Sequence, residues 1–248
     1  MADILMLKHV TAGYNRTPVL EDLSLAIVQG QITGVIGPNG SGKTTLLNVL
    51  SGLLRPSRGT VRLDGKDITA LSPDARCRLG IGRTFQMPRP FSRLKVRENV
   101  LAAAAFGSGR SRPECWDLAM DALTVTGLAD KQETLSGELN LLDRKRLEIA
   151  RAMSTEPELL LLDEIAAGLT GPEGAEIMDM VGTLKARGCT IIWIEHIMET
   201  LSRMADTLVC MAEGRVILTG PPAEVLASPE VERLYLGRVG EGASHAEG

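Results

Sequence analysis

A glycine-rich segment set between two apolar runs constrains the fold of this chain more than any other feature. The segment Gly37–Thr44 satisfies the pattern GxxxxGK[ST] at every fixed position. The apolar run Gln31–Ile36 precedes it as a candidate strand, and Thr44–Leu50 follows it with leucines on one helical face. Glycines allow backbone N–H groups to converge on phosphate oxygens, and the start of a helix adds positive potential. The pattern predicts a phosphate-binding loop in an α/β sheet, with a chance glycine-rich turn as the alternative.

The side chains at the end of this loop indicate a nucleoside triphosphate as ligand. Lys43 is expected to reach the β- and γ-phosphates, and the Thr44 hydroxyl is expected to bind Mg²⁺. The loop alone is compatible with a kinase, a GTPase or an ATPase. The residues predicted to bind the nucleotide in this segment are Gly37, Pro38, Asn39, Gly40, Ser41, Gly42, Lys43, Thr44 and Thr45.

Two carboxylates follow a second candidate strand. The continuous apolar run Leu159–Leu162 is typical of a strand buried on both faces, and Asp163 and Glu164 come directly after it. Ligands of α/β sheets bind at the carboxyl ends of the strands, so these side chains are expected near the phosphate loop. We expect Asp163 to hold Mg²⁺, directly or through water, and Glu164 to polarise the attacking water as a general base. A solvated acidic loop is the alternative, and the phosphate loop upstream disfavours it.

Buried strands alternate with helix-like runs along the chain, which indicates an α/β fold with a parallel sheet. We expect a single unit over residues 1–239, with a core of about 1–86 and 157–239 and a helical insert of about 87–156. A small polar tail over 240–248 is expected to be disordered. Besides the runs named above, candidate strands cover 23–27, 59–63, 80–85, 190–194 and 214–219. Candidate helices cover 96–105, 113–126, 144–154 and 223–227, and a further helix is expected to begin at Pro172.

Composition limits the class of protein further. Of the 248 residues, 44% are hydrophobic and 23% are charged, which is enough to bury a core. Aromatic residues make up 3%, and 31 acidic residues stand against 27 basic ones, which argues against a nucleic-acid surface. Apolar runs are too short to span a bilayer, so we expect a cytosolic protein that meets membranes only through a partner. The four cysteines lack metal-type or redox-type spacing and are expected to be free thiols.

The segments Gly37–Thr44 and Leu159–Glu164, with Tyr14, Gln86 and His196, resemble the nucleotide-binding subunit of an ABC transporter over nearly the full chain. This resemblance implies a P-loop NTPase with a RecA-like core, an N-terminal antiparallel β portion and a helical subdomain insert. It also implies that Tyr14 stacks on adenine, that Gln86 contacts Mg²⁺ or the lytic water and couples the site to a membrane subunit, and that His196 contacts the γ-phosphate. Judged singly, these three could instead be a packing tyrosine, a solvated strand end and a structural histidine.

A finer resemblance concerns one group of importers. Five segments are similar to the ATPases of branched-chain and hydrophobic amino-acid importers: Gly82–Gln86, Phe91–Val100, Arg146–Arg151, Asp163–Leu169 and Tyr235–Gly237. The related importers of urea and amides share many of these residues. In such importers the solute does not touch the ATPase subunit, so no residue of this chain selects the solute.

The chain departs from the family at its signature motif, LSGGQ. Counting back from Arg151 places the motif four residues after a similar sequence, Leu135–Leu139, and we favour the later register because the match downstream is unbroken. In this register the usual serine, last glycine and glutamine are all replaced. The predicted signature segment, which in the family seals the ATP bound by a partner subunit, consists of Leu139, Asn140, Leu141, Leu142 and Asp143.

Two interpretations of this variant remain open. Asn140 can still cap a helix, whereas Leu142 adds bulk where glycine permits close approach. Either the subunit belongs to a subgroup that tolerates the variant, or it pairs with a different ATPase and contributes one weakened composite site. Ile165 and Thr170 also replace the family's usual residues, but hydrolysis is expected to survive because Lys43 and the other catalytic positions are intact.

Basic and aromatic residues outside these motifs admit more than one interpretation. The run Arg83, Arg89, Arg93, Lys95 and Arg97 is either a contact for the cytoplasmic loops of a membrane partner or an ordinary solvated surface. The basic run 144–146 lies near a helix start, where the macrodipole disfavours it, and could face a nucleotide phosphate across a dimer interface. The two tryptophans, at positions 116 and 193, are expected in core or interface packing.

The resemblance implies the ATP-hydrolysing motor of an ABC importer, peripheral to the cytoplasmic face of the inner membrane. The expected cofactors are ATP and Mg²⁺. The expected partners are a second ABC ATPase, identical or different, two integral permease subunits and, indirectly, a solute-binding protein, with no nucleic acid. A soluble ABC ATPase of translation or DNA repair, a small-molecule kinase and a subunit with little activity alone are the rivals. The chain is too short for the first, and Glu164 with His196 suits water activation better than transfer to an acceptor.

Overall fold

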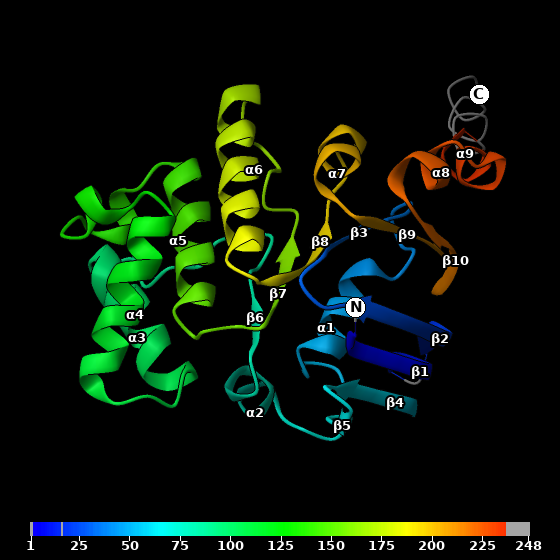
Figure 1. Cartoon of the computed structure of the whole chain (residues 1–248), viewed down its shortest axis with the longest axis horizontal. Coiled ribbons are helices and arrows are strands. Elements are labelled where there is room, and N and C mark those ends of the chain that lie inside the picture. The colour runs from blue at the N-terminus through cyan, green and yellow to red at the C-terminus, as the bar shows by residue number, and fades with distance from the viewer. Residues whose placement is uncertain (1, 16, 237–248) are drawn as a thin grey trace, which may run out of the picture.

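The computed structural model describes residues 2–15 and 17–236, and the tail expected over 240–248 lies outside these ranges. An antiparallel sheet of four strands lies at the lower right of Figure 1. In spatial order its strands are β2 (Thr17–Val28), β1 (Asp3–Tyr14), β4 (Arg58–Leu63) and β5 (Lys66–Asp67). Much of β1 and β2 alternates between buried and exposed residues, as expected for a sheet with one face on a core. The antiparallel portion implied by the family resemblance is therefore confirmed.

A second sheet of six strands forms the centre of the molecule. In spatial order its strands are β10 (Arg215–Gly220), β9 (Thr207–Ala212), β3 (Ile32–Ile36), β8 (Thr190–Ile194), β7 (Leu159–Asp163) and β6 (Ile81–Arg83). Neighbouring strands are parallel except β10 with β9. Strands β3, β7 and β8 are buried along their whole length, because both faces of the sheet are covered.

Alternate side chains of the central strands enter two different cores. Leu159 and Leu161 of β7 pack with the antiparallel sheet and with α1 (Lys43–Leu50), whereas Leu160 and Leu162 pack with α6 (Gly171–Ala186). Burial of one leucine side chain contributes about 2 kcal/mol, so these continuous apolar strands hold three layers together. The remaining helices outside the insert are α2 (Pro73–Arg78), α7 (Met198–Met204), α8 (Pro222–Leu226) and α9 (Pro229–Leu236).

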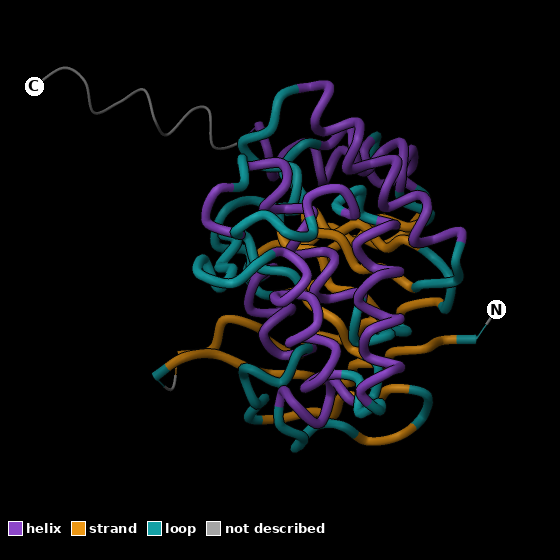
Figure 2. The backbone as a smooth tube through the Cα atoms, turned by 90° about the vertical axis from the view of Figure 1, so that its left-hand side faces the viewer, coloured by secondary structure: helices purple, strands orange, loops and turns teal. Residues whose placement is uncertain are grey.

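A helical lobe lies at the left of Figure 1 and in front of the strands in Figure 2. It contains α3 (Val96–Gly107), α4 (Arg112–Val125) and α5 (Leu141–Met153), with short 3₁₀ turns at Ala129–Lys131 and Ser136–Glu138. These helices bury a small core of their own, centred on Val100, Leu123 and Leu147. The lobe is connected to β6 through the loop that follows Gln86, so this loop joins two separately packed parts.

The elements match most of the expected runs but differ in extent. The strand expected over 80–85 ends at Arg83, and the helix expected from 144 begins at Leu141. The sequence patterns assigned no element to the residues of β1, β5, α2, α7, β9 and α9. Trp193 is fully buried as expected, whereas Trp116 is half exposed and therefore not a core residue. All four cysteines are free thiols, as expected, and no helix of the described ranges could cross a membrane.

Candidate active site

The phosphate loop begins at the carboxyl end of β3, an inner strand of the central sheet, and runs into α1. Its glycines are required by close approach and by backbone conformation. A Cβ on Gly37 would lie 2.2 Å from the carbonyl oxygen of Met211, and one on Gly42, whose φ is 101°, would lie 2.8 Å from the side chain of Leu20. Only glycine fits these two positions without displacing neighbours. The loop therefore has a fixed shape around the start of α1.

Several donor groups of this loop are bonded only within the loop or have no acceptor, and they suit a phosphate. Lys43 is 6% exposed, and its ammonium donates to the carbonyl oxygens of Gly37 at 2.7 Å and Pro38 at 3.1 Å. Burial lowers its pKa, and the carboxylates of Glu164 and Asp163 oppose this effect. The Ser41 hydroxyl is buried with no hydrogen-bond partner, and the N-cap of α1, Gly42, offers no side chain to the first amides. These donors fit the phosphates of a nucleotide.

Three residues predicted from distant parts of the sequence meet beside the loop. The Gln86 amide nitrogen donates to the Glu164 carboxylate at 2.5 Å, and the His196 ring Nε2 lies 2.6 Å from the other carboxylate oxygen. Glu164 follows β7, His196 follows β8, and Gln86 follows β6, so the parallel register brings them to one edge. Glu164 and His196 line a hollow of 180 Å³ together with Lys43 and Thr44.

The backbone of Glu164 is tightly held. Its φ is 49°, in the left-handed region that non-glycine residues seldom adopt. Its N–H donates to the Ile194 carbonyl at 2.9 Å, and its own carbonyl accepts from the Lys145 ammonium at 3.2 Å. Neighbouring elements therefore fix both sides of this residue, and its carboxylate is placed without depending on a ligand.

The three residues predicted for Mg²⁺ lie around one cavity. Thr44, Gln86 and Asp163 line a cavity of 460 Å³ that adjoins the hollow at Glu164. Burial raises the pKa of Asp163, and the nearby guanidinium of Arg83 opposes this effect. Among the described residues no group of three or more His, Cys, Asp or Glu side chains could hold a metal by itself. The donor set, one hydroxyl, one amide and one carboxylate, fits a hard cation that takes its other ligands from phosphates and water.

Arg83 differs from its expected place on a basic surface. Its side chain is 7% exposed, and its guanidinium lies 3.5 Å from the Asp163 carboxylate. The expectation that Arg83 belongs to the same basic surface as Arg89–Arg97 is therefore wrong, because its side chain points from β6 toward Asp163 at the carboxyl end of β7. Two other members of that run, Lys95 and Arg97, form ion pairs with Glu133.

Tyr14 is the last residue of β1 and contacts Asn48 of α1. Its side chain is 47% exposed, and its hydroxyl accepts a hydrogen bond from the Asn48 amide at 2.7 Å. The hydroxyl is thus satisfied by the protein, while nearly half of the residue remains open. This arrangement leaves surface on which a base could stack.

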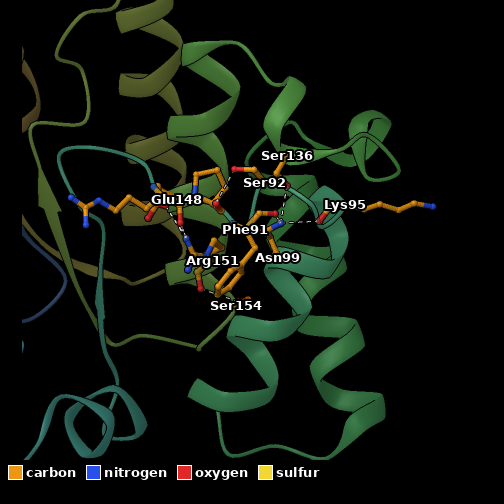
Figure 3. Close-up of polar contacts among 10 residues, drawn as sticks. Phe91, Ser92, Lys95, Asn99, Ser136, Glu148, Arg151 and Ser154 are labelled. Atoms are coloured by element: carbon orange, nitrogen blue, oxygen red, sulfur yellow. Dashed lines mark hydrogen bonds and ion pairs between the residues drawn. The ribbon is translucent and has the colours of Figure 1, made fainter.

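The loop after Gln86 is attached to the helical lobe rather than to the core (Figure 3). The Glu148 carboxylate accepts from the Arg89 backbone N–H at 3.0 Å and from the Arg151 guanidinium at 2.9 Å. The Arg151 guanidinium also lies over the Phe91 ring, 5.5 Å from its centroid. On α3, the buried Asn99 accepts from the Phe91 N–H at 2.8 Å. Motif residues of α3 and α5 therefore set the shape of this loop.

The same hydrogen-bond network involves Ser136, the serine of the earlier signature-like sequence Leu135–Leu139. The Ser136 hydroxyl of the earlier candidate sequence is fully buried, accepts from the Asn99 amide at 2.7 Å and donates to the Leu94 carbonyl at 3.0 Å. Helix α5 begins five residues later, and Asn140 is its N-cap, with the side-chain oxygen accepting from the Asp143 N–H at 2.8 Å. The helix start thus falls in the later register, and Asn140 caps it as expected.

Two charged residues of the site were not identified from the sequence. Lys145 of the basic run 144–146 is buried and donates to the Glu164 carbonyl, so the interpretation that this run faces a nucleotide phosphate across a dimer interface does not hold for this residue. Its spacing from Leu142 and Ile149 places it on the apolar face of α5, which was the available signal. Glu195 is 2% exposed, and its carboxylate accepts from the Ala166 N–H at 2.8 Å and from the Trp193 indole at 3.1 Å.

The chain is similar to known ATP-binding proteins of transport systems. The family model "ABC transporter" matches residues 20–167. The lipopolysaccharide export system ATP-binding protein LptB of Acidithiobacillus ferridurans is 35% identical, over 96% of this chain and 98% of its own length. The high-affinity branched-chain amino acid transport ATP-binding protein LivG of Salmonella typhimurium is 35% identical, over 88% and 91%.

A solved structure extends the likeness to three dimensions. An ATP-binding cassette of an ABC transporter, determined in its ADP conformation, superposes with a TM-score of 0.87 at 32% identity and covers 96% of this chain and 100% of its own. The P-loop α/β fold predicted from the sequence is thereby confirmed, and ATP hydrolysis follows as the activity of the chain. The chain belongs to the ABC transporter family, as one of its ATP-hydrolysing cassettes.

Proposed function

We propose that this chain is the motor subunit of an ABC importer for branched-chain or other hydrophobic amino acids. The observation that carries the catalytic part is the Glu164 carboxylate, held between the Gln86 amide at 2.5 Å and the His196 ring at 2.6 Å. A carboxylate in this position can accept a proton from water while its two neighbours orient it. This arrangement favours water as the nucleophile over a second substrate, as in a kinase.

Each predicted site residue has a role in this proposal. The amides of the phosphate loop and Lys43 bind the phosphates, and Tyr14 stacks on adenine. Thr44, Gln86 and Asp163 hold Mg²⁺, which when bound neutralises charge on the phosphate oxygens. Glu164 takes the proton of the attacking water, and His196 contacts the γ-phosphate.

Cassettes of this family act as dimers, and we propose that this chain completes its site with a second cassette. The signature segment, 139–143, then meets the ATP of the partner. Two exposed apolar side chains support an interface at this edge: Leu141 at the start of α5 and Ile197 beside His196, which are 45% and 49% exposed. A partner subunit would remove both from water.

The membrane partners are proposed to dock near the loop after Gln86. Phe85, Met87 and Phe91 are exposed apolar side chains of this segment, and two of them line the cavity of 460 Å³. Loops of two permease subunits would cover them and hold the chain at the cytoplasmic face of the inner membrane. A solute-binding protein would act through these permeases only.

The solute is the least constrained part of the proposal. The likeness to LivG supports a branched-chain amino acid, whereas the equal identity to LptB supports lipopolysaccharide export, and urea or amide import remains an alternative. Deleting the gene and measuring uptake of labelled leucine and urea separates them. Loss of leucine uptake supports the proposal, and loss of urea uptake or of lipopolysaccharide export alone contradicts it.

The catalytic part is tested by Glu164→Gln in the chain assembled with the membrane proteins that copurify with it. Phosphate release is expected to fall at least about a hundredfold, because the amide cannot accept the proton, while ATP binding is retained. Glu158→Gln, at an exposed position directly before the start of β7, is the control and should leave phosphate release unchanged. Equal rates for Glu164→Gln and the unmodified chain would contradict the role of Glu164.

A further inference from the structure

A buried arginine connects two parts of the nucleotide site. One guanidinium nitrogen of Arg83 donates to the amide oxygen of Asn48 on α1 at 2.8 Å and to the hydroxyl of Ser51, the C-cap of α1, at 2.8 Å. Its other terminal nitrogen lies 3.5 Å from the Asp163 carboxylate at the end of β7. The arginine therefore joins the helix that follows the phosphate loop to the carboxylate predicted to hold the metal.

The chain of contacts continues to the position predicted for adenine. The Asn48 amide uses its oxygen for Arg83 and its nitrogen for the Tyr14 hydroxyl, at 2.8 Å and 2.7 Å. Asn48 can make both contacts at once only because its amide is a donor on one side and an acceptor on the other. A continuous polar path thus runs from Tyr14 through Asn48 and Arg83 to Asp163, without any ligand.

We propose that Arg83 is a positioning residue of the ATP site, which holds Asp163 while no metal is bound and must release that carboxylate when Mg²⁺ binds. The proposal rests on the proposed role of Asp163 as a metal ligand. In this proposal Arg83 does not contact the nucleotide but determines the Mg²⁺ concentration that the site requires. Its contacts also hold α1 and β7 in a fixed position relative to each other.

Electrostatics supports an exchange between the two cations. Arg83 and Asp163 are both almost fully covered, and a buried carboxylate without a counter-charge is strongly destabilising. The guanidinium therefore stabilises the metal-free site. The same positive charge repels Mg²⁺ at close range, and the contact to Asp163 must be given up before that carboxylate can bind the metal.

This exchange predicts opposite effects on the two forms of ATP. The full-length Arg83→Met chain is compared with the unmodified chain for binding of a fluorescent ATP analogue, first in EDTA and then over a series of MgCl₂ concentrations. Affinity for the metal-free analogue is expected to fall roughly fivefold to tenfold, because one positive charge near the phosphates is lost. The Mg²⁺ concentration at half-maximal effect is expected to fall roughly fivefold, because Arg83 no longer competes for Asp163.

A purely structural role of Arg83 predicts a different result. In that case both affinities fall by the same factor, and the Mg²⁺ midpoint stays where it is; an unchanged or higher midpoint overturns the proposal. Arg78→Met is the matched control, since Arg78 is exposed and forms an ion pair with Asp74 only on the surface. If Arg83→Met does not fold, Arg83→Gln decides, since glutamine removes the positive charge but its amide can still donate to the groups of α1. A lower midpoint then supports the proposal, and an unchanged one overturns it.

Asp163→Asn separates this inference from the function on which it rests. If Asp163→Asn leaves the Mg²⁺ midpoint unchanged, the metal role of Asp163 fails, and the inference fails with it. If Asp163→Asn raises the midpoint while Arg83→Met does not lower it, only the inference about Arg83 is overturned. In the double variant, the effect of Arg83→Met on the midpoint is expected to disappear.

Discussion

Two helices of this molecule are predicted to point their N-terminal ends at a phosphate, and they are prepared in opposite ways. Helix α1 begins after Gly42, which has no side chain to cap the first amides, and its first turn carries no acidic residue. Helix α5 begins after Asn140, which accepts from the Asp143 N–H, and Asp143 itself is an acid in the first turn. The first helix leaves its amides to a ligand, whereas the second satisfies the Asp143 amide from its own chain.

The difference extends to the charges around each helix start. At α1 the buried Lys43 adds positive charge to the macrodipole. At α5 the buried Asp143 brings negative charge, and it forms ion pairs with Lys131 and Arg146. A phosphate therefore finds free donors at α1 and a carboxylate at α5. We infer that the chain is strong in the site that it builds itself and weak in the site that it completes for a partner.

The largest effect is expected from breaking the α1 side. Lys43→Ala removes the only lysine of the phosphate loop, and charge-assisted hydrogen bonds contribute roughly 1.5–3 kcal/mol each. The affinity for MgATP is expected to fall about a hundredfold, as measured by equilibrium dialysis with labelled ATP. Lys66→Ala, at an exposed position of β5, is the control. Retention of the unmodified affinity by Lys43→Ala would refute the assignment of this loop.

The next effect concerns the buried charges that join the two regions. Lys145 of α5 donates to the Glu164 carbonyl and acts on Glu195, whose pKa is raised by burial in spite of its hydrogen bonds and of Lys145. A carboxyl whose pKa is raised in the folded state stabilises the fold at low pH and loses this contribution as pH rises through the folded pKa.

Glu195→Gln keeps the acceptor oxygen but removes the ionisation. The free energy of unfolding of the unmodified chain, relative to this variant, is expected to decrease with pH above about 4.5, by at most about 1.4 kcal/mol per pH unit. Urea unfolding at a series of pH values measures this difference. Glu199→Gln, at an exposed position after His196, is the control, and parallel curves for Glu195→Gln and the unmodified chain would contradict the effect of burial.

The smallest effect is expected at the cap of α5. Asn140→Ala removes the side-chain acceptor of the Asp143 N–H and is expected to lower the free energy of unfolding by about 1 kcal/mol, whereas Asn140→Ser retains a cap and costs less. Thermal unfolding of the nucleotide-free chain measures both. If Asn140→Ala is as stable as the unmodified chain, the amides of α5 are not satisfied in the way described.

The sequence predicts individual site residues correctly where their positions depend only on neighbouring residues in the chain. The phosphate loop and the pair Asp163–Glu164 follow directly from a strand and a turn, so a contiguous pattern carries their positions. Gln86 and His196 came from the family resemblance, and the parallel register of β6, β7 and β8 explains why they meet Glu164.

The parts that the sequence does not predict depend on contacts between distant segments. Arg83 lies in a run of basic residues, and only its burial next to Asp163 distinguishes it from the others. Lys145 is likewise one of three consecutive basic residues, and its orientation is set by the packing of α5. The sequence patterns also assigned no element to the residues of β9 and α7. Strand β9 pairs with β3, and Leu201 of α7 packs in the core beside the sheet.

The contrast between α1 and α5 is tested most directly by the mass of the Glu164→Gln chain in solution with MgATP. Size-exclusion chromatography with light scattering, together with the amount of bound ATP, is expected to give a monomer that carries ATP, because α5 offers few donors to a partner's phosphate. When Asn140→Ser, Leu142→Gly and Asp143→Gln are added together to the Glu164→Gln chain, we expect a shift toward a dimer that contains two ATP molecules. A stable ATP-dependent dimer of the Glu164→Gln chain with its native α5 would contradict the account.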